Sequence, residues 1–241
     1  MNIAEMSWQQ AREAFGKTDL AIIPTGAVEV YGPHLPLGAD GIVAQALARA
    51  LAERVEAVVA PLVPVGDSRS LLSFPGTLTV SPAAFRGYIG DLAASLARWG
   101  IRRLLFVNGH AGNVAPVADL GLELAPRGLR VAQVDYWRAI ATMAPEVLDT
   151  GAMANRHAGE IGTSILLALR PDLVDMSRAA SVVPRPTLAS EYPEVALSDI
   201  SFAQITDLGM TGDATTATAE KGRIMIARLV DKLASFVADW R

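Results

Sequence analysis

Short apolar runs alternate with helical patterns along the chain, and this alternation constrains the fold more than any other feature. Strands are predicted at 20–24, 57–65, 104–107 and 131–134. Helices are predicted at 41–55, 81–99, 113–125, 160–169 and 218–239. Strands that are joined through helices run parallel, because each crossover helix returns the chain to the end of the sheet at which the previous strand began. The sequence therefore predicts an α/β fold with a mostly parallel central sheet sandwiched by helices.

Length and composition favour one globular domain over residues 1–241. Hydrophobic residues make up 51% of the chain, as in a packed domain rather than a disordered segment. The net charge is −4 and the 21 basic residues are dispersed, so no nucleic-acid partner is expected. The apolar runs are strand-sized and Met1–Gln10 lacks the pattern of a secretory signal, so we expect a cytoplasmic protein with no membrane contact.

The chain has no cysteine, which excludes disulfides, cysteine-based zinc sites and thiol nucleophiles. Any metal must therefore be held by His, Asp or Glu. Two stretches without clear periodicity, 135–156 and 181–213, are predicted to be long loops near an active site or a subunit contact.

The three histidines, His34, His110 and His157, all lie in glycine-flanked junctions between regular elements. For any one of them, a structural or surface role is as good an interpretation as a functional one. The shared context of all three favours function.

Two acids flank the first of these junctions, which follows a buried strand. Glu29 and Asp40 bracket a stretch rich in glycine and proline, and such residues hold an irregular backbone in place. A buried ionised carboxylate needs a partner charge, and a divalent cation is a natural partner for Glu29. For Asp40, an N-cap role in the following helix is an alternative.

The second junction places His110 at the carboxyl end of a predicted strand, where ligands of α/β sheets collect. Asn108 and Asn113 are candidates to orient His110, although a helix cap is the favoured role for Asn113. In the third junction His157 and Glu160 share a helical face. Glu160 is a candidate metal ligand or acid–base group with His157 as proton shuttle, while stabilisation of the helix dipole is the alternative for Glu160.

Two carboxylates and an imidazole suit Zn²⁺, Mn²⁺ or Fe²⁺. An open coordination position would lower the pKa of a bound water toward neutrality, and a nearby histidine would pass a proton to the leaving nitrogen.

The string from Glu29 to Leu37, with Asp40 beyond it, closely resembles the opening motif of the creatininase (creatinine amidohydrolase) family. The resemblance recurs in order at 74–77, 108–113, 157–160, 163–164, 169–174 and 219–222. It implies an α/β sandwich that cleaves a small amide with a metal-activated water. Family members include creatinine-opening enzymes, a formamide-cleaving deformylase and a peptidase.

The resemblance also implies roles for individual residues. It makes Glu29, Asp40 and His110 the ligands of one metal, and Asp40 a bridge to a second. It implies that His157 handles protons and that Trp137 packs against substrate. Tyr31 and His34 are further predicted substrate contacts. A homo-oligomer, a hexamer by resemblance, is expected.

The chain departs from the family pattern at four positions. Tyr31 replaces a histidine that binds the second metal, and Gly112 stands where creatininase has another carboxylate, as in many relatives. Leu71 and Gly162 replace a frequent His and a usual Glu. A phenol is a poor neutral ligand but a good hydrogen-bond donor. One metal site is therefore predicted to be intact, and Glu160 is a candidate replacement ligand for a second, giving one or two metals per chain.

The favoured hypothesis is a metal-dependent amidohydrolase that acts on a non-peptide C–N bond of a small cyclic amide or formamide, and not creatininase itself. Two alternatives stay open. One is a weak or non-hydrolytic family member that binds a metal or small ligand. The other is a one-metal enzyme with different chemistry.

Overall fold

A computed structural model describes residues 1–192, 194 and 200–240. Its centre is a four-stranded sheet in the order β2-β1-β3-β4, and every neighbouring pair is parallel. The strands are β1 (Leu20–Thr25), β2 (Val58–Val59), β3 (Arg103–Asn108) and β4 (Arg130–Asp135). The predicted fold class, with a parallel sheet between helices, is confirmed.

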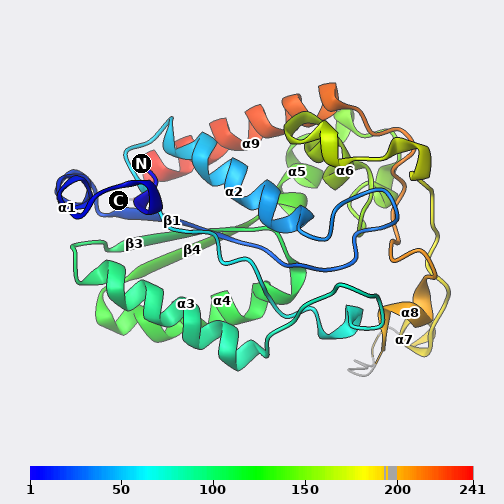
Figure 1. Cartoon of the computed structure of the whole chain (residues 1–241), viewed down its shortest axis with the longest axis horizontal. Coiled ribbons are helices and arrows are strands. Elements are labelled where there is room, and N and C mark those ends of the chain that lie inside the picture. Colours follow the sequence, from blue (N-terminus) through cyan, green and yellow to red (C-terminus); the bar gives the residue numbers. More distant parts are fainter. Residues whose placement is uncertain (193, 195–199, 241) are drawn as a thin grey trace.

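Helices cover both faces of the sheet (Figure 1). One layer holds α2 (Ala39–Ala52), α5 (Tyr136–Met143), α6 (Glu160–Leu169) and α9 (Ala219–Asp239). The other layer holds α3 (Pro82–Ala97) and α4 (Val114–Leu124). Of the helices that the sequence predicts, all five are present, with ends shifted by a few residues.

Successive side chains along each strand contribute to two separate cores, one on each face of the sheet. In β1, Leu20 and Ile22 pack into the core under α2 and α9, whereas Ala21 and Ile23 pack into the core under α3 and α4. Successive side chains of a strand point to opposite faces, so a strand covered on both sides must be apolar throughout. This explains why these strands are continuous apolar runs rather than alternating patterns.

Two predicted boundaries were wrong. The expected strand at 57–65 is regular only at Val58–Val59, because Pro61 and Pro64 have no N–H to donate to a ladder. The expected loop at 135–156 contains α5, whose Tyr136 and Ile140 are buried one turn apart. An eight-residue helix offers too few turns for its periodicity to stand out.

Besides α5, three short α-helices in the described ranges lie outside the predicted pattern. The N-terminal helix α1 (Trp8–Phe15) begins at a capping box formed by Ser7 and Gln10. The single-turn helices α7 (Leu188–Glu191) and α8 (Phe202–Ile205) interrupt the expected loop at 181–213, part of which lies outside the described residues. Both lie at the end of the molecule away from the chain termini (Figure 1). None of the helices in the described ranges has the length and apolarity needed to cross a bilayer.

The carboxyl ends of β1 and β3 lie side by side at the centre of the sheet. Thr25 and Asn108 are register partners, and the Thr25 hydroxyl donates to the Asn108 Oδ1 atom at 3.1 Å. The segments that follow these strands therefore emerge next to each other, and they carry the polar residues singled out above.

We expect Phe106→Ala to lower the free energy of unfolding by about 3–5 kcal/mol, because this fully buried ring of β3 would leave a cavity. Urea denaturation measures the change. Leu122→Ala is the control, because Leu122 on α4 is 77% exposed and should change stability by less than about 0.5 kcal/mol. Similar losses in both variants would contradict this description of the core.

Candidate metal centre

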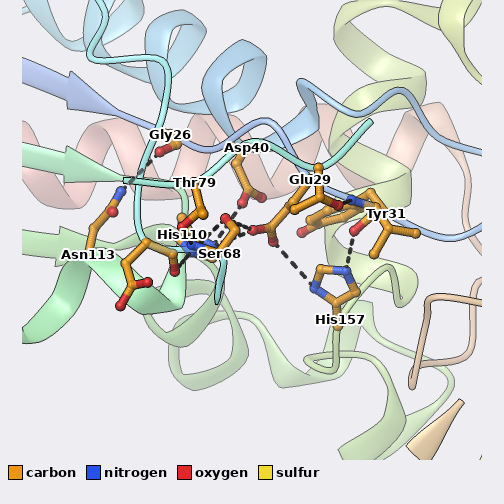
Figure 2. A network of polar contacts seen from close by, with 12 residues as sticks. Gly26, Glu29, Tyr31, Asp40, Ser68, Thr79, His110, Asn113 and His157 are labelled. Carbon is orange, nitrogen blue, oxygen red and sulfur yellow. Dashed lines mark hydrogen bonds and ion pairs between the residues drawn. The ribbon is translucent and has the colours of Figure 1, made fainter. Parts of the chain in front are cut away.

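Three potential ligands from distant segments meet at the carboxyl edge of the sheet. Glu29 follows β1, Asp40 lies in the first turn of α2, and His110 follows β3. All three are buried, and one ligand atom from each lies within 4.8 Å of the others. Figure 2 shows their side chains pointing toward one another.

The His110 ring presents its Nδ1 atom to both carboxylates. This atom lies 3.1 Å from Glu29 Oε2 and 3.4 Å from Asp40 Oδ2. The opposite Nε2 atom lies 2.8 Å from the Asp67 carbonyl oxygen, which can only accept a hydrogen bond. Nε2 therefore carries the ring proton, and in a neutral imidazole Nδ1 offers a lone pair, as metal-binding histidines do.

The cluster needs positive charge to be stable. Burial, followed by repulsion from Glu29, raises the pKa of Asp40 to about 7. Although burial opposes it, contacts with Asp40 and Glu29 raise the pKa of His110 well above its usual value. Asp40 Oδ1 is buried and has no hydrogen-bond partner among the described residues. A divalent cation would neutralise the carboxylates and use the free lone pairs, so this donor set fits a metal.

Neighbouring polar groups orient the ligands. The Ser68 hydroxyl donates to Glu29 Oε2 at 2.5 Å. The Asn108 side chain donates to the His110 carbonyl oxygen at 2.8 Å and accepts from the His110 N–H at 3.1 Å, as expected for a residue that orients His110. Ser68 was not predicted, because nothing in its sequence context distinguishes it from other loop serines.

The expected cap role of Asn113 was wrong. Its side chain makes no cap hydrogen bond at the start of α4 and donates instead to the Gly26 carbonyl oxygen at 3.0 Å. Asn113 thus ties the segment after β3 to the segment after β1. Asp40 is not the N-cap of α2 either, since Gly38 holds that position.

Gly112 is required by the turn that holds His110. A Cβ atom at position 112 would lie 2.0 Å from the Asp67 carbonyl oxygen and 2.7 Å from His110 Nε2. Any side chain would displace the carbonyl that orients the imidazole. In the described fold this position therefore cannot contribute a carboxylate ligand.

The three ligands line a cavity of about 780 Å³. Aromatic side chains form much of its wall, and polar or cationic ones line other parts. The lining includes Tyr31, Leu71, Tyr136, Trp137, His157, Phe202, Arg69, Asn155 and Arg156. A cavity of this size and mixed lining is typical of small-molecule sites. Trp137 and Tyr31, two of the predicted substrate contacts, are both part of this lining.

His157 lies on the other side of Glu29 from His110 (Figure 2). Its Nδ1 atom is 3.9 Å from Glu29 Oε1, and its Nε2 atom is 2.7 Å from the Val30 carbonyl oxygen. Burial lowers the pKa of His157, and the Glu29 carboxylate partly offsets this. A neutral ring that donates from Nε2 leaves Nδ1 as a proton acceptor beside the cavity.

Glu160 and His34 do not join this group, contrary to the roles predicted for them. The buried Glu160 carboxylate forms an ion pair with Lys221 and accepts from the Thr150 hydroxyl at 2.7 Å. His34 is buried with its Nε2 atom 3.0 Å from the Thr163 hydroxyl, and burial lowers its pKa to about 4. Neither side chain belongs to the described cavity lining, because each is directed at partners inside the protein.

The family model "Creatininase: Creatinine amidohydrolase" matches residues 4–237. The chain belongs to the creatininase family. It is 35% identical to the "Mycofactocin precursor peptide peptidase" of Mycobacterium ulcerans (strain Agy99), over 91% of this chain and 84% of that protein. It is 30% identical to the "Creatinine amidohydrolase" of Pseudomonas putida, over 98% of this chain and 96% of that protein.

The fold agrees with this membership. A solved structure described as "Creatininase Mn" superposes with a TM-score of 0.82 at 28% identity, and the match covers 99% of this chain and 97% of that one. The creatininase family consists of hydrolases, and the similar proteins include both a peptide peptidase and an amidohydrolase. The restriction to non-peptide C–N bonds that we expected is therefore not supported.

We expect Ser68→Ala to weaken divalent metal binding by about 10- to 100-fold, because Glu29 would lose the donor that orients it. Competition with a fluorescent chelator measures the affinity. Ser95→Ala is the matched control, because Ser95 is an exposed residue of α3 whose hydroxyl only bonds its own helix. Equal affinity of the Ser68 variant and the parent protein would remove this role.

Glu160→Gln separates a structural role from a ligand role. We expect it to lower the free energy of unfolding by about 3 kcal/mol, because Lys221 would lose its buried partner, while metal content stays unchanged. Glu29→Gln should instead lose the bound metal, because it removes a proposed ligand. Elemental analysis and thermal melts of both variants test this, and loss of metal from Glu160→Gln would restore Glu160 as a ligand.

Proposed function

We propose that this chain is a metal-dependent hydrolase that uses water to cleave an amide C–N bond, in a peptide or in a smaller amide. We propose Glu29, Asp40 and His110 as the ligands of its divalent cation. The observation that carries the proposal is the convergence of these three ligand atoms within 4.8 Å at the wall of a cavity of about 780 Å³.

Two carboxylate oxygens and one imidazole nitrogen suit Zn²⁺, Mn²⁺ or Fe²⁺. When bound, such a cation supplies Lewis-acid activation of water and of the substrate carbonyl. We propose one cation per chain, since Tyr31 supplies a neutral phenol and position 112 has no room for a side chain. The other residues must bind substrate, exclude water and move protons.

We assign proton transfer to His157. Its Nδ1 atom lies 3.9 Å from Glu29 Oε1, and its Nε2 atom is anchored on a backbone carbonyl, so the ring has a fixed orientation. The Phe202 ring packs edge-on against the imidazole with the ring centroids 5.0 Å apart, and the Tyr31 ring packs against it at a tilt with the centroids 4.5 Å apart. This geometry suits a group that accepts a proton from water and returns it to the leaving nitrogen.

The cavity suggests the class of substrate. Its volume is in the range that holds a drug-sized ligand, which is large enough for a short peptide or a substituted cyclic amide. Leu71, Trp137 and Phe202 form apolar and aromatic parts of the lining. We therefore propose a substrate with an apolar or aromatic group next to the amide that is cleaved.

The experiment begins with elemental analysis of protein purified without added metal, for which we expect one divalent cation per chain. Hydrolysis of a panel of formamides, cyclic amides and short peptides is then measured before and after treatment with a chelator. We expect activity to disappear with the metal and to return with Zn²⁺ or Mn²⁺. Two cations per chain would contradict the single site, and metal binding without hydrolysis would favour the non-hydrolytic alternative.

His157→Ala should lower kcat by about 10²- to 10⁴-fold and leave the metal content unchanged, because it removes the proton carrier but no ligand. Steady-state kinetics on a cleaved panel member measures the effect. An unaltered kcat would transfer the proton role to another residue.

A homo-oligomer in the cytoplasm stays a prediction. Sedimentation of the purified protein measures its oligomeric state, and a run that gives only monomer would contradict the predicted homo-oligomer.

A further inference from the structure

Two phenols stand together in the wall of the cavity. The hydroxyl oxygens of Tyr31 and Tyr136 lie 3.4 Å apart, and both residues line the cavity with Asp40 although they are almost fully buried. The pKa of an ordinary phenol is near 10, well above physiological pH. Both are therefore neutral at physiological pH, and each carries one proton.

Tyr31 lies between the ligand group and the proposed proton carrier. It lines the same cavity as Asp40 and lies two residues beyond Glu29 in the sequence. Its ring centroid is 4.5 Å from that of His157. Figure 2 shows Tyr31 on the same side of Glu29 as His157. A substrate carbonyl placed for attack between these groups would come close to the phenol.

The two tyrosine hydroxyls carry two protons, and the hydrogen bond between them leaves one proton available for donation. One hydrogen bond between the two hydroxyls uses one of their two protons, and either oxygen can be its donor. A buried O–H without an acceptor is costly, so the second proton needs an oxygen to bind. Asp40 lines the same cavity and can accept a hydrogen bond, but an Asp40 carboxylate that also ligates a cation is a weaker acceptor. An oxygen of a bound substrate would complete the arrangement.

Gly162 makes room for this phenol. A Cβ atom at position 162 would lie 3.2 Å from the Tyr31 hydroxyl oxygen and 3.3 Å from its Cε1 atom. Both distances are shorter than ordinary van der Waals contact, so a side chain at this position would push the Tyr31 ring. The Tyr31 position and the glycine on α6 thus depend on each other.

We propose that the Tyr31 hydroxyl is a catalytic hydrogen-bond donor to the carbonyl oxygen of the amide under attack, with Tyr136 as its positioning residue. This inference rests on the proposed hydrolase function. Negative charge grows on that oxygen as water adds to the carbon, and a fixed neutral donor stabilises it. The phenol keeps its proton throughout, and the oxygen returns to a carbonyl when the C–N bond breaks.

Tyr31→Phe removes only the hydroxyl. With an amide from the panel above, we expect kcat to fall by about 10²- to 10³-fold while KM changes little, because the bond strengthens only as charge develops. Metal content should be unchanged. Titration of the metal-loaded protein with methylphosphonate, a tetrahedral anion that resembles the charged intermediate, should give a Kd at least about tenfold higher in the variant than in the parent.

Two further variants test the arrangement by other routes. Gly162→Ala should also lower kcat, because it displaces the Tyr31 ring without removing its hydroxyl. Tyr136→Phe should cause a smaller loss in kcat with KM unchanged. Tyr88→Phe is the matched control, because Tyr88 is a half-exposed tyrosine on α3 away from the cavity lining.

The outcomes separate the two proposals. Metal-loaded, active protein whose Tyr31→Phe variant keeps kcat and the methylphosphonate Kd within twofold would overturn the role of Tyr31 and leave the hydrolase intact. A parent protein that binds metal and cleaves an amide but does not bind methylphosphonate would also count against the donor. A parent protein that binds no divalent metal and cleaves no panel member would overturn both.

Discussion

Two buried carboxylates and one imidazole nitrogen within 4.8 Å of one another form the interaction on which the rest of the site depends. Such a group is stable only with added positive charge, which a proton or a cation can supply. The contact of His110 Nε2 with the Asp67 carbonyl places the proton of a neutral ring on the nitrogen away from the carboxylates, which suits a cation. The lone pair then faces the carboxylates, and Ser68 directs Glu29 toward the same point.

The parallel sheet makes this convergence possible. The ends of β1 and β3 are adjacent, so the segments that carry Glu29 and His110 leave the sheet side by side. Asp40 then arrives in the first turn of α2, which packs over the same edge. Helices on both faces bury the strands, and the irregular segments after the strands form the cavity. The candidate ligands and the cavity are therefore concentrated at one end of the sheet.

Three of the four departures from the family pattern follow from packing on the same wall. Gly112 is imposed by the turn that orients His110, since a side chain there would meet the Asp67 carbonyl. Tyr31 and Gly162 are matched, because the phenol occupies the space beside the glycine. A site with one cation and a phenol next to it is chemically coherent, since a neutral donor supplies the electrophilic contact that a second cation would otherwise give. The proposed roles of Tyr31 and His157 build on this arrangement.

Local sequence determined the fold class, the family and the three proposed ligands, because strand-and-helix periodicity and short contiguous motifs around Glu29, Asp40 and His110 are properties of neighbouring residues. Only the tertiary structure decided the partners of the remaining polar groups. Ser68 meets Glu29 across 39 positions, Tyr31 meets Tyr136 across 105, and Glu160 meets Lys221 across 61. No local pattern encodes such contacts, since they arise when packed elements bring distant side chains together. For the same reason Glu160 and His34 resembled site residues in sequence and were found bonded inside the protein.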